Sequence, residues 1–187
     1  GNRVVAADFD FRKPALSGLF DLPKDARGAL QVLSGEATPR DVVWEVLLEG
    51  RRPVATPLAE SRQNGAARAP QDSSVNGRGG KLWVIPTGGS LRSQSDLKTA
   101  NLPRLIEELR AGADFVVLDT PPALLTVEMS ELAGLIDSVL VVVRHGRVTH
   151  RSLRSLNRQA QRWPAEIAGV VVTDAVSESQ YAYYGGR

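Results

Sequence analysis

Three acidic side chains follow two apolar runs of the chain. Asp8 and Asp10 come after the run Val4–Ala7, and Asp119 comes after the run Phe115–Leu118. Transfer of a phosphoryl group from a nucleoside triphosphate to a hydroxyl needs oxygen ligands for a hard cation and a carboxylate that accepts the hydroxyl proton. We therefore treat Asp8, Asp10 and Asp119 as candidate catalytic residues and metal ligands.

The elements that would position these acids are buried strands. Neither run alternates with polar residues, which is typical of strands covered on both faces in a parallel sheet. Further apolar runs at 82–86, 139–143 and 167–172 are separated by segments of helical spacing. The pattern predicts an α/β fold with a doubly wound, mostly parallel sheet of five buried strands and helices on both faces. Ligands bind beyond the carboxyl ends of such strands, where the acids are expected.

The remaining segments predict short helices and two irregular stretches. Residues 28–35 are expected to form a two-turn helix that ends at a glycine, and a second short helix is expected from Thr38 through Trp44. Residues 50–80 are rich in polar residues, proline and glycine, and are predicted to be a disordered insertion. Residues 175–187 are expected to be a flexible tail. Neither side of the insertion carries a complete sheet, so residues 1–187 are interpreted as a single, partial domain.

Composition excludes several classes of protein. The chain has 187 residues and no cysteine, which excludes a disulfide framework and a thiolate metal site. No apolar run approaches the roughly 18 residues that a membrane-spanning helix needs. The net charge of +2 is small, so no specific nucleic-acid partner is expected.

A phosphate-binding loop is not evident. Gly77–Lys81 superficially resembles one, but no Ser or Thr follows Lys81, and the segment enters a strand instead of leaving one for a helix. We therefore reject this segment as the phosphate cradle.

Two motifs carry a resemblance to a known family. Asp8-x-Asp10-x-Arg12-x-Pro14 resembles the second Walker motif (Walker A′) of bacterial tyrosine kinases of the capsular and exopolysaccharide type. The segment 115–122 resembles their Walker B motif, and the tail resembles their autophosphorylated C-terminus. The resemblance implies a P-loop kinase domain that lacks its first Walker motif, which would explain why the chain opens directly in an apolar strand. The chain alone is then expected to be inactive.

The resemblance implies roles for particular residues. ATP and Mg²⁺ are the expected cofactors, with Mg²⁺ binding and activation of the tyrosine hydroxyl carried by Asp8, Asp10 and Asp119. The other candidates are nucleotide contacts at Arg12, Thr173 and Asp174 and phosphoacceptors at Tyr181, Tyr183 and Tyr184. Thr173 stands where the family usually has an adenine-contacting Asn, which is a departure from the pattern.

The resemblance also implies a cellular setting. The whole protein would be an ATP-dependent tyrosine autokinase that regulates polysaccharide polymerisation or export at the inner, cytoplasmic face of the cell membrane. Its expected partners are a membrane-embedded chain-length regulator, on the same or a separate chain, a cognate tyrosine phosphatase, and further copies of itself in a homo-oligomer. Two alternatives are a partition or septum-positioning ATPase and a catalytically degenerate regulatory scaffold.

Each motif also has a purely structural interpretation. Asp8 and Asp10 could cap the turn that follows them, and Asp119 could simply end a strand. Arg12 could be a solvated surface cation. The three tyrosines could be loosely packed side chains of a flexible tail.

Overall fold

The computed structural model describes residues 1–49, 52–58, 80–91, 99–124 and 128–175. The chain divides into two compact units, Gly1–Pro121 and Pro122–Arg187, which we describe separately. No helix in the described part of the chain is long and apolar enough to cross a membrane.

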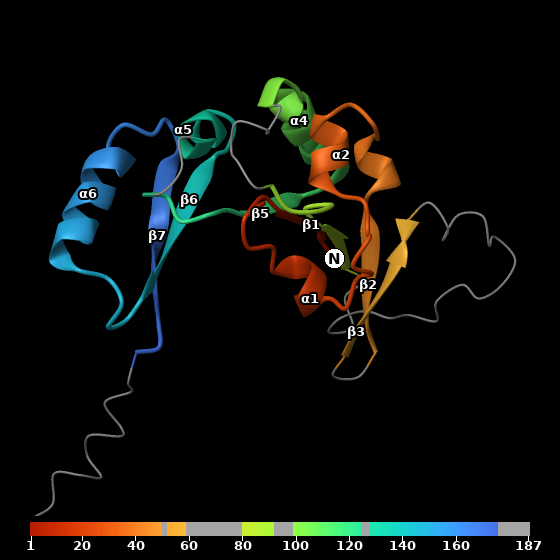
Figure 1. The fold of residues 1–187 in the computed structure, drawn as a ribbon, viewed down its shortest axis with the longest axis horizontal. Helices are drawn as coiled ribbons and strands as arrows, with labels where there is room; N and C mark the ends of the chain where they lie inside the picture. The colour runs from red at the N-terminus through yellow and green to blue at the C-terminus, as the bar shows by residue number, and fades with distance from the viewer. Residues whose placement is uncertain (50–51, 59–79, 92–98, 125–127, 176–187) are drawn as a thin grey trace, which may run out of the picture. The chain divides into compact units, whose positions relative to one another are not determined.

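The first unit is built on a five-stranded sheet. Its strand order is β3-β2-β4-β1-β5, and Figure 1 shows it beneath the helices α2 and α4. The central strand β1 (Arg3–Asp8) runs parallel to β4 (Lys81–Ile85) on one side and to β5 (Phe115–Asp119) on the other. A hairpin of β2 (Trp44–Glu49) and β3 (Arg52–Pro57) joins the sheet antiparallel to β4.

Short helices cover both faces of this sheet. The helices α2 (Ala29–Leu33) and α4 (Leu102–Gly112) lie on one side and α1 (Leu16–Leu19) on the other (Figure 1). The 3₁₀ turns η1 (Pro39–Asp41) and η3 (Thr99–Asn101) lead into β2 and α4. The side chains that α4 buries recur at helical spacing, as the sequence predicts: Leu102, Leu105, Ile106 and Leu109.

The second unit is smaller. Two parallel strands, β6 (Ser138–Arg144) and β7 (Glu166–Thr173), form its sheet. The helix α5 (Glu128–Ala133) precedes β6, and α6 (His150–Ala160) connects β6 to β7. The unit is therefore a βαβ crossover, the expected connection between parallel strands.

The predicted fold class, a mixed α/β fold with a mostly parallel sheet, is confirmed. The helix expected from Thr38 through Trp44 is wrong, because only Pro39–Asp41 form a 3₁₀ turn and Trp44 begins β2. Trp44 lies opposite Val84 of β4, so pairing with the sheet decides its conformation. The strand β3 falls within the predicted insertion, and residues 59–79 of that insertion lie outside the described residues.

Burial on both faces is not found for every predicted strand. In β1 and β4, Val5, Ala7, Val84 and Ile85 are buried. In β5, β6 and β7, by contrast, alternate apolar side chains are exposed by half or more, among them Phe115, Val117, Leu140, Val142, Val170 and Val172. The apolar runs thus predict the positions of the strands correctly. They wrongly predict that both faces of every strand are buried.

A close backbone approach fixes α2 against the loop that follows β4. The backbone N–H groups of Ala29 and Leu30 donate to the carbonyls of Pro86 and Thr87, both at 2.9 Å. The side-chain amide of Gln31 reaches across the same junction, since its Oε1 accepts from Gly28 N and its Nε2 donates to the Gly88 carbonyl. A Cβ at Gly28 would lie 2.0 Å from the Pro86 carbonyl oxygen, so this approach requires glycine.

We predict that Gly28→Ala lowers the free energy of unfolding by about 2–3 kcal/mol, because backbone atoms must move to admit the methyl group. The control is Gly18→Ala in α1, where a Cβ meets nothing within 4 Å and alanine is the better helix former. Urea denaturation of both variants measures the effect. Equal stability of the two variants would contradict this account of the junction.

Candidate active site

The structure brings the three candidate carboxylates to one edge of the first unit's sheet. In the parallel pairing of β1 with β5, Asp8 lies directly opposite Asp119. The Phe9 backbone N–H donates to the Asp119 carbonyl at 2.7 Å, which extends the pairing one residue beyond β1. The sequence predicted this convergence from acids at the ends of two apolar runs.

Asp8 is buried and holds the loop that leaves β1. Its side chain is 0% exposed. Its Oδ1 accepts from the backbone N–H of Asp10 at 3.0 Å, and its Oδ2 accepts from those of Ala15 and Leu16 at 2.9 and 3.0 Å. Both oxygens are therefore committed to the backbone of residues 10–16, which makes Asp8 a positioning residue in this geometry.

Asp10 is more accessible and keeps one oxygen outside these bonds. Its Oδ1 accepts from the backbone N–H groups of Arg12 and Lys13, at 3.1 and 3.0 Å. The flanking rings of Phe9 and Phe11 are buried and pack edge to face with centroids 5.7 Å apart. Because the rings anchor the backbone on either side of Asp10, its carboxylate has a fixed place at the edge of the sheet.

Asp119 completes the group of acids and carries an unfavourable charge. Partial burial raises the pKa of its carboxyl above the ordinary value, and the negative charges of Asp8 and Asp10 raise the pKa further. A carboxylate beside two others is stabilised by any cation that enters the group. The arrangement is thus suited to a divalent metal or to a proton.

The loop after β4 contains a buried polar residue, Thr87, that the sequence analysis did not select. Thr87 is only 2% exposed, and its backbone carbonyl receives the N–H of Leu30. Further along this loop, the Leu91 N–H donates to the Phe11 carbonyl at 2.9 Å. Since β4 neighbours β1, a polar residue just past the end of β4 was the signal that could have located Thr87.

Lys81 lies at the other end of the same strands. It is paired in register with Arg3 at the start of β1, and its Nζ lies 3.4 Å from a carboxylate oxygen of Glu45. Parallel strands bind ligands at their carboxyl ends, so Lys81 is far from the acids in register. This position supports the rejection of Gly77–Lys81 as a phosphate cradle.

Of the other predicted site residues, the structure describes Arg12, Thr173 and Asp174. Arg12 is exposed and contributes its backbone N–H to the Asp10 turn. Thr173 and Asp174 belong to the second unit, where Thr173 ends β7 and Asp174 accepts a 2.5 Å hydrogen bond from Arg144 Nε. Tyr181, Tyr183 and Tyr184 lie outside the described residues.

The three acids do not form a complete metal cage. Within the described ranges of the chain, no three His, Asp or Glu side chains are placed to hold a metal ion together. Mg²⁺ usually takes only one or two protein carboxylates and completes its shell with water and substrate phosphates. The oxygens left over on Asp10 and Asp119 fit that mode of binding.

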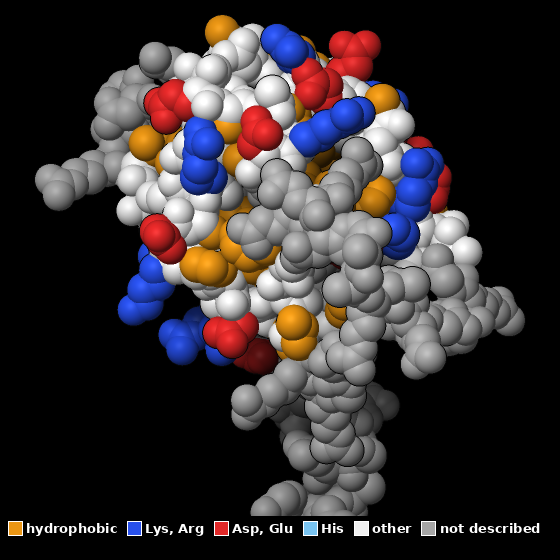
Figure 2. Space-filling view, turned by 90° about the vertical axis from the view of Figure 1, so that its right-hand side faces the viewer, with side chains coloured by type: hydrophobic (Ala, Val, Ile, Leu, Met, Phe, Trp, Pro, Cys, Tyr) orange, Lys and Arg blue, Asp and Glu red, His pale blue; other side chains and the backbone are white. Residues whose placement is uncertain are grey.

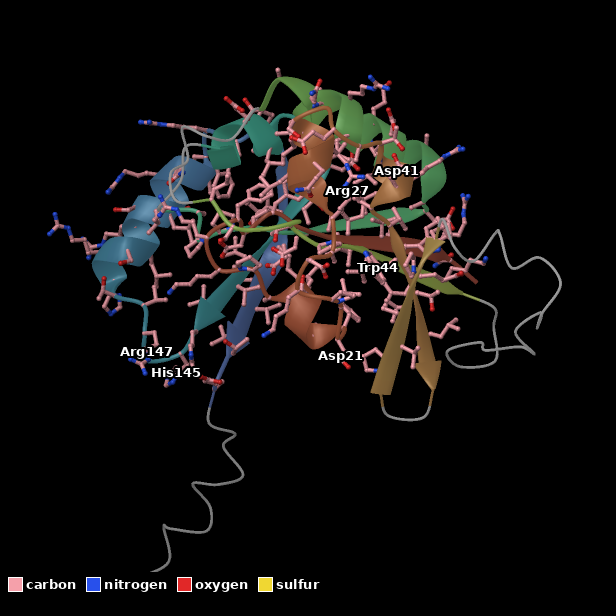
Figure 3. The ribbon with its side chains drawn as sticks, turned by 45° about the vertical axis from the view of Figure 1, so that its right-hand side comes forward. Asp21, Arg27, Asp41, Trp44, His145 and Arg147 are labelled. Atoms are coloured by element: carbon pink, nitrogen blue, oxygen red, sulfur yellow. The ribbon has the colours of Figure 1, made fainter. Side chains whose placement is uncertain are left out.

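We predict that Asp8→Asn destabilises the protein by about 2–4 kcal/mol, because an amide nitrogen would face backbone donors in place of a carboxylate oxygen. Asp21→Asn is the control, since Asp21 is exposed with φ of 53°, a conformation that Asn tolerates. Asp21 is labelled in Figure 3. Chemical denaturation should separate the two variants, and near-equal stabilities would refute the positioning role of Asp8.

Comparison with known proteins finds relatives in sequence and in fold. No family model matches the chain. Over 189 residues, which is all of the chain and 21% of the relative, it is 29% identical to EpsB of Ralstonia nicotianae. It is 22% identical over 184 residues to the tyrosine-protein kinase CpsD of Streptococcus agalactiae, covering 98% of the chain and 66% of CpsD.

A third relative is named for transport. The succinoglycan biosynthesis transport protein ExoP of Rhizobium meliloti is 28% identical over 192 residues, which is all of the chain and 20% of ExoP. The chain therefore spans about a fifth of EpsB and ExoP and about two thirds of CpsD.

Solved structures share the fold. The VpsO kinase domain aligns with a TM-score of 0.68 at 20% identity, over 94% of this chain and 71% of that one. The kinase domain of Escherichia coli ETK gives 0.64 at 19%, over 94% and 58%. The septum site-determining protein MinD of Pyrococcus horikoshii, complexed with Mg-ADP, gives 0.58 at 15%, over 92% and 58%. Over its whole length the chain is thus similar to bacterial tyrosine-protein kinases, and it shares the fold of their kinase domains and of MinD.

Proposed function

We propose that the chain is the catalytic part of an ATP-dependent protein-tyrosine autokinase that regulates polysaccharide polymerisation or export. The observation that carries the proposal is the meeting of Asp8, Asp10 and Asp119 at the carboxyl edge of one parallel sheet. Its relatives in sequence are tyrosine-protein kinases and a polysaccharide transport protein. MinD is more distant in sequence, which favours the kinase over the septum-type ATPase.

Asp10 and Asp119 are the residues proposed to hold Mg²⁺. Carboxylate oxygens are hard ligands, and two of them leave room in the metal's shell for phosphate oxygens and water. When bound, the ion would neutralise charge that develops on the transferred phosphoryl group. Its charge would also offset the repulsion that raises the pKa of Asp119.

The acceptor is proposed to be a tyrosine hydroxyl of Tyr181, Tyr183 or Tyr184. The pKa of a free tyrosine hydroxyl is about 10, so a carboxylate that takes its proton assists attack on the phosphorus. Asp10 and Asp119 have the oxygens available for this task, and Asp8 keeps the Asp10 turn in place. The β and γ phosphates are proposed to bind a glycine-rich loop outside this chain, with Arg12, Thr173 and Asp174 as further nucleotide contacts.

The proposed setting follows from the relatives. We place the whole protein at the inner face of the cell membrane, with a membrane-embedded chain-length regulator, a cognate tyrosine phosphatase and further copies of itself as partners. The name of ExoP, a transport protein of succinoglycan biosynthesis, supports a location at a membrane.

Activity is tested in the full-length protein that carries this chain. We expect Asp10→Asn and Asp119→Asn each to reduce phosphotyrosine formation by about 100-fold or more, as loss of a metal ligand or proton acceptor does. Asp21→Asn, an exposed acid outside the cluster, should leave it within about twofold. Mass spectrometry after incubation with ATP and Mg²⁺ gives the measurement.

The acceptor sites are tested with a triple variant, Tyr181→Phe, Tyr183→Phe and Tyr184→Phe. Most phosphate should disappear while binding of a fluorescent ATP analogue stays unchanged, because the variant removes hydroxyls and not the nucleotide site. Phosphate on serine instead of tyrosine would overturn the kinase proposal.

The charge of Asp119 also predicts a pH-dependent effect on stability. Its folded-state pKa is raised, so the folded state loses stability as the pH rises above the ordinary pKa of about 4. Asp119→Asn should therefore raise the melting temperature by about 1–3 °C at pH 7 and leave it nearly unchanged near pH 3. Glu107→Gln, an exposed acid on α4, is the control for a general loss of negative charge. A lower melting temperature for Asp119→Asn at pH 7 would contradict the repulsion.

A further inference from the structure

The helix α6 and the turns beside it carry a one-sided positive charge. Between Ser138 and Ala165 the sequence contains six arginines and no Asp or Glu: Arg144, Arg147, Arg151, Arg154, Arg158 and Arg162. We propose that this arginine stripe binds the anionic phosphates of a lipid membrane surface. The proposal goes beyond the kinase activity and does not depend on it.

The geometry of α6 places the charges on one face. Arg151, Arg154 and Arg158 are spaced by three and four residues, so they project from the same side of the helix. All three are exposed, whereas Leu156 and Ala160 on the opposite side are partly buried. Arg147 extends the charge into the turn before α6 (Figure 3), and α6 itself is about 16 Å long.

The charges of the stripe are not balanced within the structure. In the part of the chain that is described, Arg144 is the only arginine of the six with a carboxylate partner, Asp174. Arg158 donates to the hydroxyl of Ser155 at 3.1 Å, which leaves its charge uncompensated. A phosphate group would satisfy both the charge and the donor groups of these guanidinium ions.

The helix α4, which has the same length as α6, does not share this excess of arginine over acidic residues. Its arginines alternate with acids, and Arg104 forms an ion pair with Glu108 at 2.9 Å. The face of the molecule in Figure 2 likewise shows acidic and basic side chains interspersed. A helix face that only needs solubility can use charges of both signs, as α4 does, so the exclusion of acids from α6 calls for an anionic partner.

Two further features favour a lipid surface over a nucleic acid. Val148, in the turn before α6 and next to Arg147, is exposed by 38%, and an aliphatic side chain gains by entering the headgroup region. The described stripe offers no exposed aromatic ring on which bases could stack, since Trp163 is buried. Its relative ExoP is named for polysaccharide transport, which also indicates a membrane setting.

The test is flotation of the full chain with vesicles of phosphatidylcholine alone or with about one third of the anionic lipid phosphatidylglycerol. The wild type should bind only the anionic vesicles and be released by high salt. Each arginine near an anionic surface contributes about a fivefold gain in affinity, so Arg151→Gln, Arg154→Gln and Arg158→Gln together should weaken binding by roughly 100-fold. Circular dichroism checks that α6 still folds.

Two matched variants isolate the stripe. Arg40→Gln, Arg104→Gln and Arg110→Gln remove the same net charge from the first unit and should change binding less than about threefold. Replacing Arg151, Arg154 and Arg158 by Lys keeps the charge and should retain most binding. Equal loss in both Gln variants, equal binding to uncharged vesicles, or tighter binding to duplex DNA than to anionic vesicles at the same phosphate concentration would overturn the proposal.

Discussion

The bonds of one buried carboxylate determine the shape of the candidate site. An ionised side chain at 0% exposure is costly unless donors surround it, and Asp8 receives three backbone N–H groups from the loop that it closes. The same three N–H groups would otherwise lack acceptors where the strand turns into α1. The buried carboxylate of Asp8 therefore depends on the N–H groups of this loop, and the loop depends on the carboxylate as their acceptor. A neutral or longer side chain at this position would disturb both.

This constraint decides what the neighbouring acids can do. With Asp8 turned inward and Asp10 held by its own turn, the free oxygens of the group belong to Asp10 and Asp119. Movement of Asp8 cannot relieve the repulsion among the acids, so the pKa of Asp119, which burial and these charges raise, falls only when a cation enters the group. Asp8 thus helps to make the site attractive to a cation, although Asp8 itself need not contact that cation.

The sequence was sufficient for the parts of the site that depend on regular geometry. Parallel strands that end on acids place those acids at one edge, so Asp8 and Asp119 could be paired in advance. It could not separate the roles of Asp8 and Asp10, because that difference lies in which backbone N–H groups the following loop presents. The hairpin at Trp44 was missed since its strands are set by β4, which is distant along the chain. Thr87 was missed because only its place just past the end of β4 marks it, and a single threonine has no periodicity that draws attention to it.

Net charge is a poor guide to the electrostatics of this molecule. The whole chain carries +2, and the six arginines of the stripe carry +6, so the remaining residues together carry −4. At physiological ionic strength charges are screened over about 8 Å, so a partner meets the local array and not the sum. A chain that is nearly neutral overall can therefore present a strongly cationic helix at one place and a cluster of acids at another. The two attract ligands of opposite charge, and segregation of charge along the sequence allows one small chain to carry both.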